Sequence, residues 1–498
     1  MEYQSSRGQV CAVKAAEAIV MGIAPDGGLF VPDYIPQLKS DFITAMSNMT
    51  YRQRAEAILA LYLTDFTGDE LADCVDQAYN ADKFDDPAIA PLVKVDEGFF
   101  IQELWHGPTS AFKDMALQLL PHLMTLSAVK SGEKREIVIL VATSGDTGKA
   151  ALEGFKDVAG TRIVVFYPRD GVSKVQQRQM TTQEGNNVHV AAVTGNFDDA
   201  QSGVKKIFAD QDLSALLDRH NMKLSSANSI NWGRLVPQIV YYISAYLDLA
   251  AGQHINAGDK INIVVPTGNF GNILAAFYAG LMGVPVGKLI CASNANNVLT
   301  DFIQTGTYDR KREFAKTISP SMDILISSNL ERLLYEITGH DHSLISQWME
   351  SLKQHGKYTV DNESRQKIQD KFWAGYCSDD ETRTTIKKIW EEKKYLLDPH
   401  TAVAVNVWEK YQQITGDKTA TIIASTASPF KFGQSVAEEL FAVEDDDEFV
   451  ILQKLADITG NNIPAAIKQL QEKEIRHKTE CSGEHMADTL MSLLNLPG

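Results

Sequence analysis

The sequence predicts an α/β fold with two doubly wound, mostly parallel sheets, each forming the core of a domain. From Glu136 onward, short apolar runs rich in β-branched residues alternate with helical patterns. Such near-continuous apolar runs are typical of strands buried on both faces of a parallel sheet. The spans between them are long enough for the helical crossovers that parallel strands require. The chain has 498 residues, 44% hydrophobic and 22% charged, which leaves room for about three domains with large cores.

The first part of the chain predicts a helical N-terminal region. The stretch YRQRAEAILALYLTDF, residues 51–66, has a helical pattern, and the turn-forming PDGG at 25–28 interrupts the stretches before it. We therefore assign residues 1–90 to a small helical unit of their own.

The predicted strands fall into two groups. The first lies between residues 136 and 226 and contains EIVILVAT, TRIVVFY and NVHVAAV. The second contains INIVVPT, KLICAS and ATIIAS, at 261–267, 288–293 and 420–425. Residues 295–418 are mostly helical and charged, with few strand candidates, and we interpret them as a helical insertion.

These groups set the expected domain boundaries. Residues 127–245 form a small α/β domain. Residues 91–126 and 246–498 together form a large α/β domain that includes the helical insertion at about 295–418. No internal repeat or low-complexity linker divides the chain further.

Charge and cysteine usage argue against several classes of protein. Lys and Arg number 47 against 64 Asp and Glu, so the formal net charge is −17. This field repels phosphate backbones and argues against a nucleic-acid partner. The five cysteines are scattered without a CxxC pair, so we expect reduced thiols and no metal site. The acidic run EDDDE, residues 444–448, is more typical of a solvated loop than of a cation site.

Targeting and membrane signals are not found. The start, MEYQSSRGQV, lacks the basic and apolar regions of a signal peptide. No segment reaches about 18 consecutive apolar residues. We expect a cytoplasmic protein with no membrane partner.

The first motif with chemical potential is HGPTSAFKD, residues 106–114. A turn leads into a predicted amphipathic helix, with Lys113 at its start beside Ser110 and Asp114. The positive end of a helix dipole disfavours an ammonium, and a neutral lysine amine is what Schiff-base chemistry requires. Taken alone, such a lysine is more often an ordinary surface residue.

Two further motifs predict anion sites at helix beginnings. In TSGDTG, residues 143–148, hydroxyls and backbone N–H groups follow a buried strand. In GNFGN, residues 268–272, two glycines allow close backbone approach between a strand and a helix. The glycine spacing is neither that of a Walker A loop nor GxGxxG. The first motif is equally consistent with an ordinary capped turn.

Two polar segments complete the set. SSANSINWGR, residues 225–234, combines Arg234 with amide and hydroxyl donors, which suits a phosphate dianion. An Arg paired with a surface acid is the commoner arrangement for that motif alone. In ASTASPFKF, residues 424–432, Ser425 and Thr426 follow a strand and place hydroxyls at the sheet crevice.

Taken in this order, the segments resemble threonine synthases, pyridoxal-phosphate (PLP) enzymes of the tryptophan-synthase-β class, also called fold type II. The match runs from PDGGLFVP through HGPTSAFKD, TSGDTG, NSINWGR, PTGNFGN and DPHTAVA to ASTASPFKF, and covers most of the chain. It is most similar to the longer branch of that family, which has an extra N-terminal region and a helical insertion. The resemblance implies PLP as the cofactor.

The resemblance also implies which residues bind the cofactor. Lys113 is similar to the family's Schiff-base lysine, and Asp146 stands beside the cofactor O3′ where related enzymes often have Asn. A carboxylate and a phenolate should repel each other there. Thr426, or with less support Ser425, is similar to the hydroxyl residue that faces the pyridine nitrogen. The cup for the cofactor phosphate would consist of Gly268, Asn269, Phe270, Gly271 and Asn272.

The substrate residues follow from the same resemblance. Thr143, Ser144 and Thr147 match the turn that binds the substrate carboxylate. Asn228, Ser229 and Arg234 match the pattern for the substrate phosphate. The family's STAHP motif differs here, because Ser428 stands where the histidine is expected.

The implied reaction converts O-phospho-L-homoserine and water to L-threonine and phosphate, the last step of threonine biosynthesis. Lys113 would move protons at Cα and Cβ, so its pKa must fall below the reference value of about 10.4. Two alternatives remain open: a PLP-dependent phospho-lyase that releases 2-oxobutyrate and phosphate, and a non-catalytic PLP carrier on the same fold. A monomer and a homodimer are equally compatible with the sequence.

Overall fold

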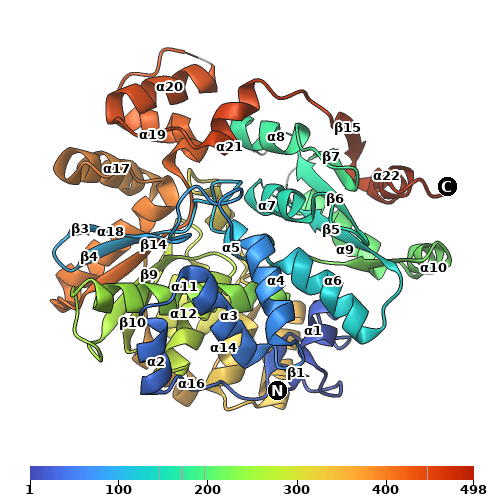
Figure 1. Cartoon of the computed structure of the whole chain (residues 1–498), viewed down its shortest axis with the longest axis horizontal. Helices are drawn as coiled ribbons and strands as arrows, with labels where there is room; N and C mark the ends of the chain where they lie inside the picture. The colour runs from blue at the N-terminus through green and yellow to red at the C-terminus, as the bar shows by residue number, and fades with distance from the viewer. Residues whose placement is uncertain (144, 170–171, 196, 446, 498) are drawn as a thin grey trace.

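The computed structural model describes residues 1–143, 145–169, 172–195, 197–445 and 447–497, and only the backbone of residues 40, 41, 197 and 198. It contains two larger sheets with helices packed around them (Figure 1). Among the described residues, no helix combines the length and apolar character needed to cross a membrane.

The N-terminal region is helical, as predicted, with one small antiparallel sheet. Side-chain caps begin two of its helices, because Thr50 and Thr67 each accept a hydrogen bond from the N–H group three residues later. The elements are β1 (Tyr3–Ser5), α1 (Ala15–Met21), β2 (Phe30–Pro32), α2 (Ser40–Met46), α3 (Tyr51–Tyr62) and α4 (Gly68–Ala78).

The larger sheet has six strands in the order β13-β10-β9-β14-β4-β3, all parallel except the β3–β4 pair. Its central strand reads INIVVP and is buried throughout. Ile263 and Val265 contribute to one apolar cluster, whereas Val264 contributes to another. The strands are β3 (Leu92–Asp96), β4 (Phe99–Glu103), β9 (Ile261–Pro266), β10 (Val286–Ser293), β13 (Phe372–Tyr376) and β14 (Thr421–Ser425).

The smaller sheet has five parallel strands in the order β15-β7-β6-β5-β8. Alternate residues of β5 again face two clusters, with Ile139 in one and Leu140 in the other. Both sheets are thus covered on both faces, and the predicted doubly wound fold class is confirmed. The strands are β5 (Glu136–Ala142), β6 (Thr161–Pro168), β7 (Val188–Thr194), β8 (Met222–Ser225) and β15 (Thr479–Ser482).

The remaining elements up to residue 337 connect and cover these strands. They are α5 (Asp114–Leu117), α6 (Leu120–Ser131), α7 (Asp146–Phe155), α8 (Lys174–Thr181), α9 (Phe197–Ala209), α10 (Gln211–Arg219), α11 (Trp232–Ala251), α12 (Gly271–Leu281), α13 (Val298–Thr305), β11 (Thr307–Asp309), a 3-10 turn (Pro320–Met322) and α14 (Leu330–Ile337).

The last third of the chain is mostly helical. Its elements are α15 (His342–His355), β12 (Lys357–Thr359), α16 (Asn362–Lys371), α17 (Asp379–Lys393), α18 (Pro399–Thr415), a 3-10 turn (Pro429–Phe432), α19 (Gly433–Leu440), α20 (Glu448–Thr459), α21 (Ala465–Lys468), two 3-10 turns (Gln469–Gln471 and Gly483–His485) and α22 (Met486–Leu493).

The structure extends one prediction about the second half and corrects two others. The stretch 295–418, interpreted as a helical insertion, also contributes to the larger sheet and its cover, because β13 is an edge strand and α18 packs against β9, β10 and β14. The large domain does not extend over all of 246–498, because β15 pairs with β7 in the smaller sheet. The run 444–448 is not wholly a solvated loop. Asp446 lies outside the described residues, but Glu448 begins α20 and is buried, accepting the N–H of Val175 at 3.1 Å.

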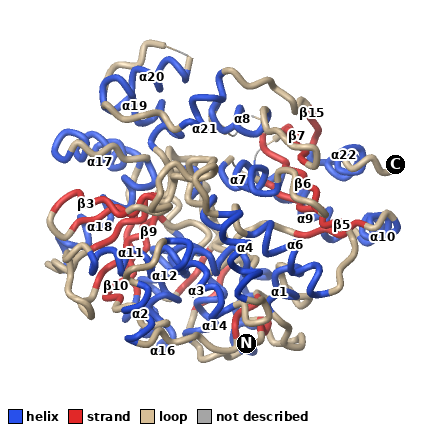
Figure 2. The backbone as a smooth tube through the Cα atoms, in the orientation of Figure 1, coloured by secondary structure: helices blue, strands red, loops and turns tan. Residues whose placement is uncertain are grey.

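The carboxyl ends of the parallel strands face a common region between the two sheets. Loops gather there, as Figure 2 shows. In open α/β sheets ligands bind beyond the carboxyl ends of strands. The five motifs with chemical potential each follow or overlap the end of one of these strands: β4, β5, β8, β9 or β14.

Candidate active site

Lys113 is held at the end of the larger sheet by backbone pairing between two loops. The Phe112 N–H donates to the carbonyl of Thr426 at 2.8 Å, and the Ser428 N–H donates to the carbonyl of Ser110 at 3.1 Å. Ala111 and Ala427 form a β-bridge between these bonds. The loops after β4 and β14 are therefore joined directly beside Lys113.

The helix predicted to begin at Lys113 is much shorter than expected. Lys113 is the N-cap of α5, which has only four residues, so its dipole is small. The Asp114 carboxylate does not face Lys113 but accepts from the N–H and hydroxyl of Thr109, at 2.8 and 2.7 Å. Burial, and not the dipole, is the main reason that this lysine is perturbed.

The Lys113 amine lies in a buried polar cluster. Its Nζ is 3.4 Å from Asp146 Oδ2 and 3.5 Å from Ser321 Oγ. Burial lowers the pKa of Lys113; Asp146 opposes this, while the nearby cations Lys431 and Arg234 add to it. The net direction favours the neutral amine that nucleophilic and proton-transfer chemistry requires.

The Asp146 carboxylate is surrounded by donors. Oδ1 accepts from Lys431 Nζ at 3.0 Å and from Gln176 Nε2 at 2.9 Å. Oδ2 accepts from the Ser321 hydroxyl at 3.0 Å and has Lys113 as its more distant neighbour. Burial opposes ionisation, but the cations Lys431 and Lys113 and the bond from Gln176 hold the pKa of Asp146 well below its usual range.

Sequence reasoning missed several residues of this cluster. Lys431 belongs to the quoted motif ASPFKF, and its complete burial could not be read from the pattern. His400 belongs to DPHTAVA; its Nδ1 is 2.9 Å from Asp398 Oδ1, and its Nε2 accepts the Ser321 N–H at 3.1 Å. No local signal indicated Gln176 or Ser321, which reach the site from α8 and from the 3-10 turn at 320–322.

The glycine loop after β9 leads into α12. Its N-cap, Phe270, has a left-handed backbone with φ of 63° and makes no side-chain cap. A Cβ on Gly268 would lie 3.0 Å from the carbonyl oxygen of Ser321, so this glycine permits close packing of two backbones. A Cβ on Gly271 would meet only ordinary contacts, the nearest 3.4 Å away. Asn269 is exposed, whereas Phe270 and Asn272 are buried.

The Asn272 side chain is oriented as a donor. Its Oδ1 accepts from the hydroxyls of Tyr241, at 3.0 Å, and Tyr242. Burial raises the pKa of both tyrosines well above the usual value, so both remain donors. The amide Nδ2 is buried and has no hydrogen-bond partner among the residues described. A buried donor held in this way is suited to an anionic ligand.

Arg234 lies in the first turn of α11 and is buried. Nη1 donates to the carbonyl of Ala227, and Nε is unpaired within the described part of the chain. Burial lowers the pKa of Arg234 to about 10, which still leaves it charged at neutral pH. The half-buried Asn228 and Ser229 precede it in the same turn. The structure thus brings these three predicted residues together beside the glycine loop, since a Cβ on Gly271 would lie 3.8 Å from Ser229 Cβ.

The predicted hydroxyl residues differ in availability. The Ser425 hydroxyl contacts Trp105 Nε1 at 3.0 Å and the Thr401 hydroxyl at 3.1 Å, which favours Thr426 as the ligand-facing residue. The Thr143 hydroxyl accepts the N–H groups of Gly145 and Gly148 inside its own turn, at 3.0 and 2.9 Å. Thr147 is half-buried in the first turn of α7. Ser144 lies outside the described residues.

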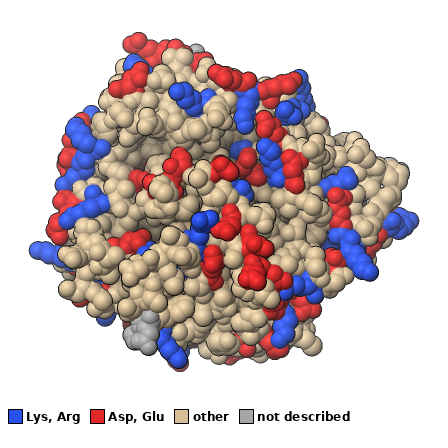
Figure 3. Space-filling view, in the orientation of Figure 1, with Lys and Arg blue, Asp and Glu red and all other residues tan. Residues whose placement is uncertain are grey.

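The donor set fits pyridoxal phosphate and a second anion. A basic amine suits an aldehyde, and the glycine loop with the free Asn272 amide suits a phosphate. Arg234 and Lys431 add two buried cations, of which Lys431 is paired with Asp146. The cluster retains positive charge although acidic side chains cover the middle of the face in Figure 3. Among the described residues no group of His, Cys, Asp and Glu is arranged for a metal ion.

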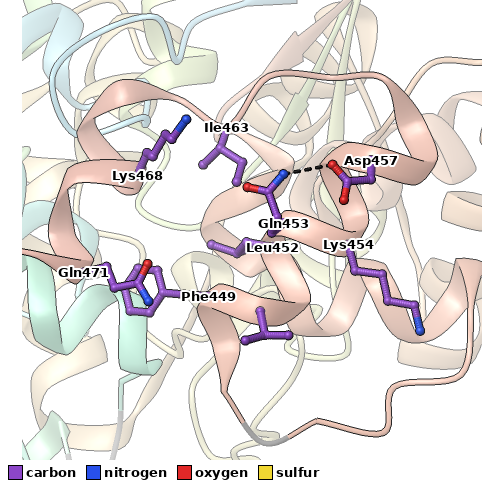
Figure 4. Close-up of a pocket in the computed structure, with 9 residues that line it drawn as sticks. Phe449, Leu452, Gln453, Lys454, Asp457, Ile463, Lys468 and Gln471 are labelled. Atoms are coloured by element: carbon purple, nitrogen blue, oxygen red, sulfur yellow. Dashed lines mark hydrogen bonds between the residues drawn. The ribbon is translucent and has the colours of Figure 1, made fainter.

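A different pocket lies between α20 and the segment 463–471 (Figure 4). Its described lining includes Phe449, Leu452 and Lys468, and Gln453 donates to Asp457 at 2.9 Å. None of these residues belongs to the predicted motifs. The candidate active site is therefore the Lys113 cluster and not this pocket.

Two family models match the chain in succession. The model described as "Threonine synthase N terminus" matches residues 2–79, and the model described as "Pyridoxal-phosphate dependent enzyme" matches residues 84–426. Threonine synthase-like 1 from Homo sapiens is 42% identical over 87% of this chain, which spans 58% of the length of that relative. Threonine synthase from Saccharomyces cerevisiae is 38% identical over 85% of this chain and 86% of its own.

Solved structures give the same result. PLP-bound threonine synthase from Brucella melitensis is similar with a TM-score of 0.87 and 36% identity, over 99% of this chain and 98% of that chain. Threonine synthase from yeast has a TM-score of 0.88 at 34% identity and covers 99% of each chain. Since the family models, the relatives and the solved structures that match the whole chain agree with one another, the chain belongs to the threonine synthase family of pyridoxal-phosphate-dependent enzymes.

Proposed function

We propose that this protein is a threonine synthase that converts O-phospho-L-homoserine and water to L-threonine and phosphate. One observation carries the proposal: the buried Lys113 lies in the same site as the N-termini of α11 and α12, and each N-terminus offers donors for an anion. Phosphohomoserine brings one phosphate and the cofactor brings another, so the reaction needs two such sites. Residues 268–272 would hold the cofactor phosphate and Arg234 the substrate phosphate.

The assignment of the two phosphates follows from their chemistry. Gly268 and Gly271 suit a phosphate bound through backbone N–H groups and the Asn272 amide. Arg234 supplies a full positive charge with an unpaired Nε, which suits a group that leaves with two negative charges. Asn228 and Ser229 would add neutral donors to that second phosphate.

Lys113 has the central role in proton transfer. When bound, PLP withdraws electrons from the substrate and makes the protons at Cα and Cβ acidic. The neutral Lys113 amine would take these protons and return them, because its pKa is lowered by burial. Thr426 would face the pyridine nitrogen, and Asp146 the cofactor O3′.

The proposed residues account for the bonds that change. The Cγ–O bond breaks and its electron pair leaves with the phosphate, whose charge Arg234 would offset. Cγ gains a proton to become the methyl group, and the elements of water add as hydroxyl at Cβ and hydrogen at Cα. The substrate carboxylate would lie at the beginning of α7, where Thr143, Ser144 and Thr147 were predicted to bind it.

Product analysis tests the proposal directly. The purified chain, saturated with PLP, is incubated with O-phospho-L-homoserine, and phosphate, threonine and 2-oxobutyrate are quantified together. We expect threonine and phosphate in equal amounts, and at least about 100-fold slower formation of both by a Lys113→Ala control. Absence of phosphate release by the PLP-saturated chain would contradict any catalytic role for phosphohomoserine.

The phospho-lyase reaction is the alternative that the same product analysis distinguishes. A phospho-lyase would eliminate phosphate from the same substrate, and hydrolysis by one water would then release 2-oxobutyrate and ammonia. Stoichiometric 2-oxobutyrate without threonine in the same assay would favour this reaction.

The cellular location is part of the proposal. Cys11, Cys74, Cys291, Cys377 and Cys481 are all free thiols. Free thiols are typical of a reducing compartment, and this supports the predicted cytoplasmic location.

A further inference from the structure

We propose that Lys431 is a positioning residue of this site: by holding Asp146, its ammonium leaves the Lys113 amine free to give up its proton. Lys431 acts through Asp146 and is not assigned a contact with substrate. This role rests on the proposed function in one respect: the proposed proton transfer requires a neutral Lys113 amine.

The first support is the way in which the Asp146 carboxylate is shared. Lys431 and Gln176 occupy Oδ1 at 3.0 and 2.9 Å, and Ser321 occupies Oδ2 at 3.0 Å. Lys113 is the most distant of the four donors at 3.4 Å. The carboxylate is therefore satisfied without Lys113, which can turn away toward a ligand at little cost.

The second support is that Lys431 itself has no freedom to move. Its side chain is completely buried, and Nζ also donates to the carbonyl of Thr109 at 2.8 Å. Thr109 belongs to the loop that carries Lys113, and the Ser428 N–H ties the Lys431 turn to Ser110 of that loop. Lys431 is thus fixed relative to both Asp146 and Lys113.

The third support is electrostatic balance. An unpaired carboxylate beside Lys113 would favour the ammonium form, whereas a paired one has little net charge. The charged and titratable groups that face this cluster are Asp146, Lys431 and Arg234, with His400 behind Ser321. Asp114 lies on the other side of Thr109; burial raises its pKa to about 6, and Lys431 opposes this. With both groups charged, the Lys431–Asp146 pair is neutral overall.

The test measures the titration of Lys113 in the full chain without cofactor. Trace acetylation at a series of pH values, followed by peptide mapping, gives the midpoint at which the Lys113 amine becomes reactive. Lys431→Met should raise this midpoint by about one pH unit or more, because Lys113 is then the only cation in contact with Asp146, whose other donors, Gln176 and Ser321, are neutral. In an Asp146→Asn background the same substitution should cause a clearly smaller shift.

Two further variants separate this role from a structural one. Lys149→Met is the matched control, because Lys149 is also buried and paired with an acid, Glu153 at 2.9 Å, but lies outside the cluster. It should leave the Lys113 midpoint unchanged. Lys431→Gln keeps N–H donors for Asp146 and the Thr109 carbonyl, so it tests loss of charge if the Met variant does not fold.

The outcomes distinguish this inference from the proposed function. An unshifted Lys113 midpoint in folded Lys431 variants would overturn the inference even if threonine were formed normally. Equal shifts with Asp146 present and replaced would also overturn it, since Lys431 would then act by repulsion alone. A shift that depends on Asp146 in a chain that does not use phosphohomoserine would uphold the inference and remove the proposed function.

Discussion

The N-termini of α12 and α11, which we propose to hold the two phosphates, differ in the donors that they offer. At α12, Gly268 lets two backbones pack closely, and the buried Asn272 amide offers a neutral donor that has no partner among the described residues. At α11, Asn231 caps the helix through its side chain and Arg234 adds a buried guanidinium. The two lie side by side, since a Cβ on Gly271 would be 3.8 Å from Ser229 Cβ.

This difference teaches how one site can hold two phosphates for different purposes. Backbone donors are fixed, do not titrate and suit a group that stays bound. A guanidinium offers a fork of donors and a full charge, which suits a group that is recognised and then expelled. The neutral α12 beginning therefore fits the cofactor, and the cationic α11 beginning fits the substrate.

The largest effect is expected at Lys113, which serves both helix beginnings. Lys113→Ala should lower kcat by a factor of at least about 10²–10⁴, the range for a lost general acid–base group. Lys113→Arg should do the same, because a guanidinium keeps its proton. Borohydride reduction with PLP should label residue 113 of the native chain and of neither variant. If another lysine of the native chain were labelled instead, the assignment of Lys113 as the Schiff-base lysine would be wrong.

The next largest effect is expected at the N-terminus of α11, which carries Arg234, and it should leave the cofactor site at the N-terminus of α12 unchanged. Arg234→Ala should weaken phosphohomoserine binding by about 1.5–3 kcal/mol, the contribution of a charge-assisted contact. Cofactor content and absorbance should remain normal. Arg234→Lys should recover part of the loss, because it keeps the charge but not the fork. If Arg234→Ala instead lost PLP and kept its affinity for phosphohomoserine, the assignments of the cofactor phosphate and the substrate phosphate would have to be exchanged.

A smaller effect is expected at the neutral beginning. Gly271→Ala has room in the ligand-free chain, since its Cβ would be 3.4 Å from Asn329 Nδ2. It should fold normally yet weaken PLP binding by about 1–3 kcal/mol through crowding of the cup. Equilibrium titration with PLP measures this.

Gly268→Ala is the contrasting variant of that loop. Its Cβ would lie 3.0 Å from the Ser321 carbonyl, so the segment that touches Lys113 and Asp146 must shift. We expect it to lower both PLP affinity and the thermal midpoint of the chain. Unchanged PLP affinity in folded Gly271→Ala would argue that the cofactor phosphate lies elsewhere.

The smallest effect concerns the cap of α11. Asn231 Oδ1 accepts the Gly233 N–H at 2.9 Å, and its Nδ2 donates to the carbonyl of Ile19 at 2.9 Å. Asn231→Ala should lower stability by about 1 kcal/mol, as other lost N-caps do, with cofactor affinity preserved. Thermal unfolding with and without PLP measures both quantities. If Asn231→Ala lost PLP, the cap of α11 would also affect cofactor binding at the N-terminus of α12.

Sequence reasoning succeeded where the signal is local. The apolar runs predicted β5, β6, β7, β9, β10 and β14, and the order of motifs indicated the family. It failed for β13 and β15, because a short edge strand such as FWAGY or TECS lacks the apolar run of a central strand. The helix expected to begin at Lys113 ends after one turn, and the helical pattern continues through the break between α5 and α6.

By itself the sequence determined the fold class, the family and the residues that follow each strand. These depend on hydrophobic periodicity and on motifs whose members are close in the chain. Only the tertiary structure decided that Asp146, Lys431 and Ser321 converge on Lys113 from three different segments. It also decided that the Arg234 Nε and the Asn272 amide remain unpaired among the described residues. Burial and hydrogen-bond partners set the pKa of each group, and both arise only when distant segments pack together.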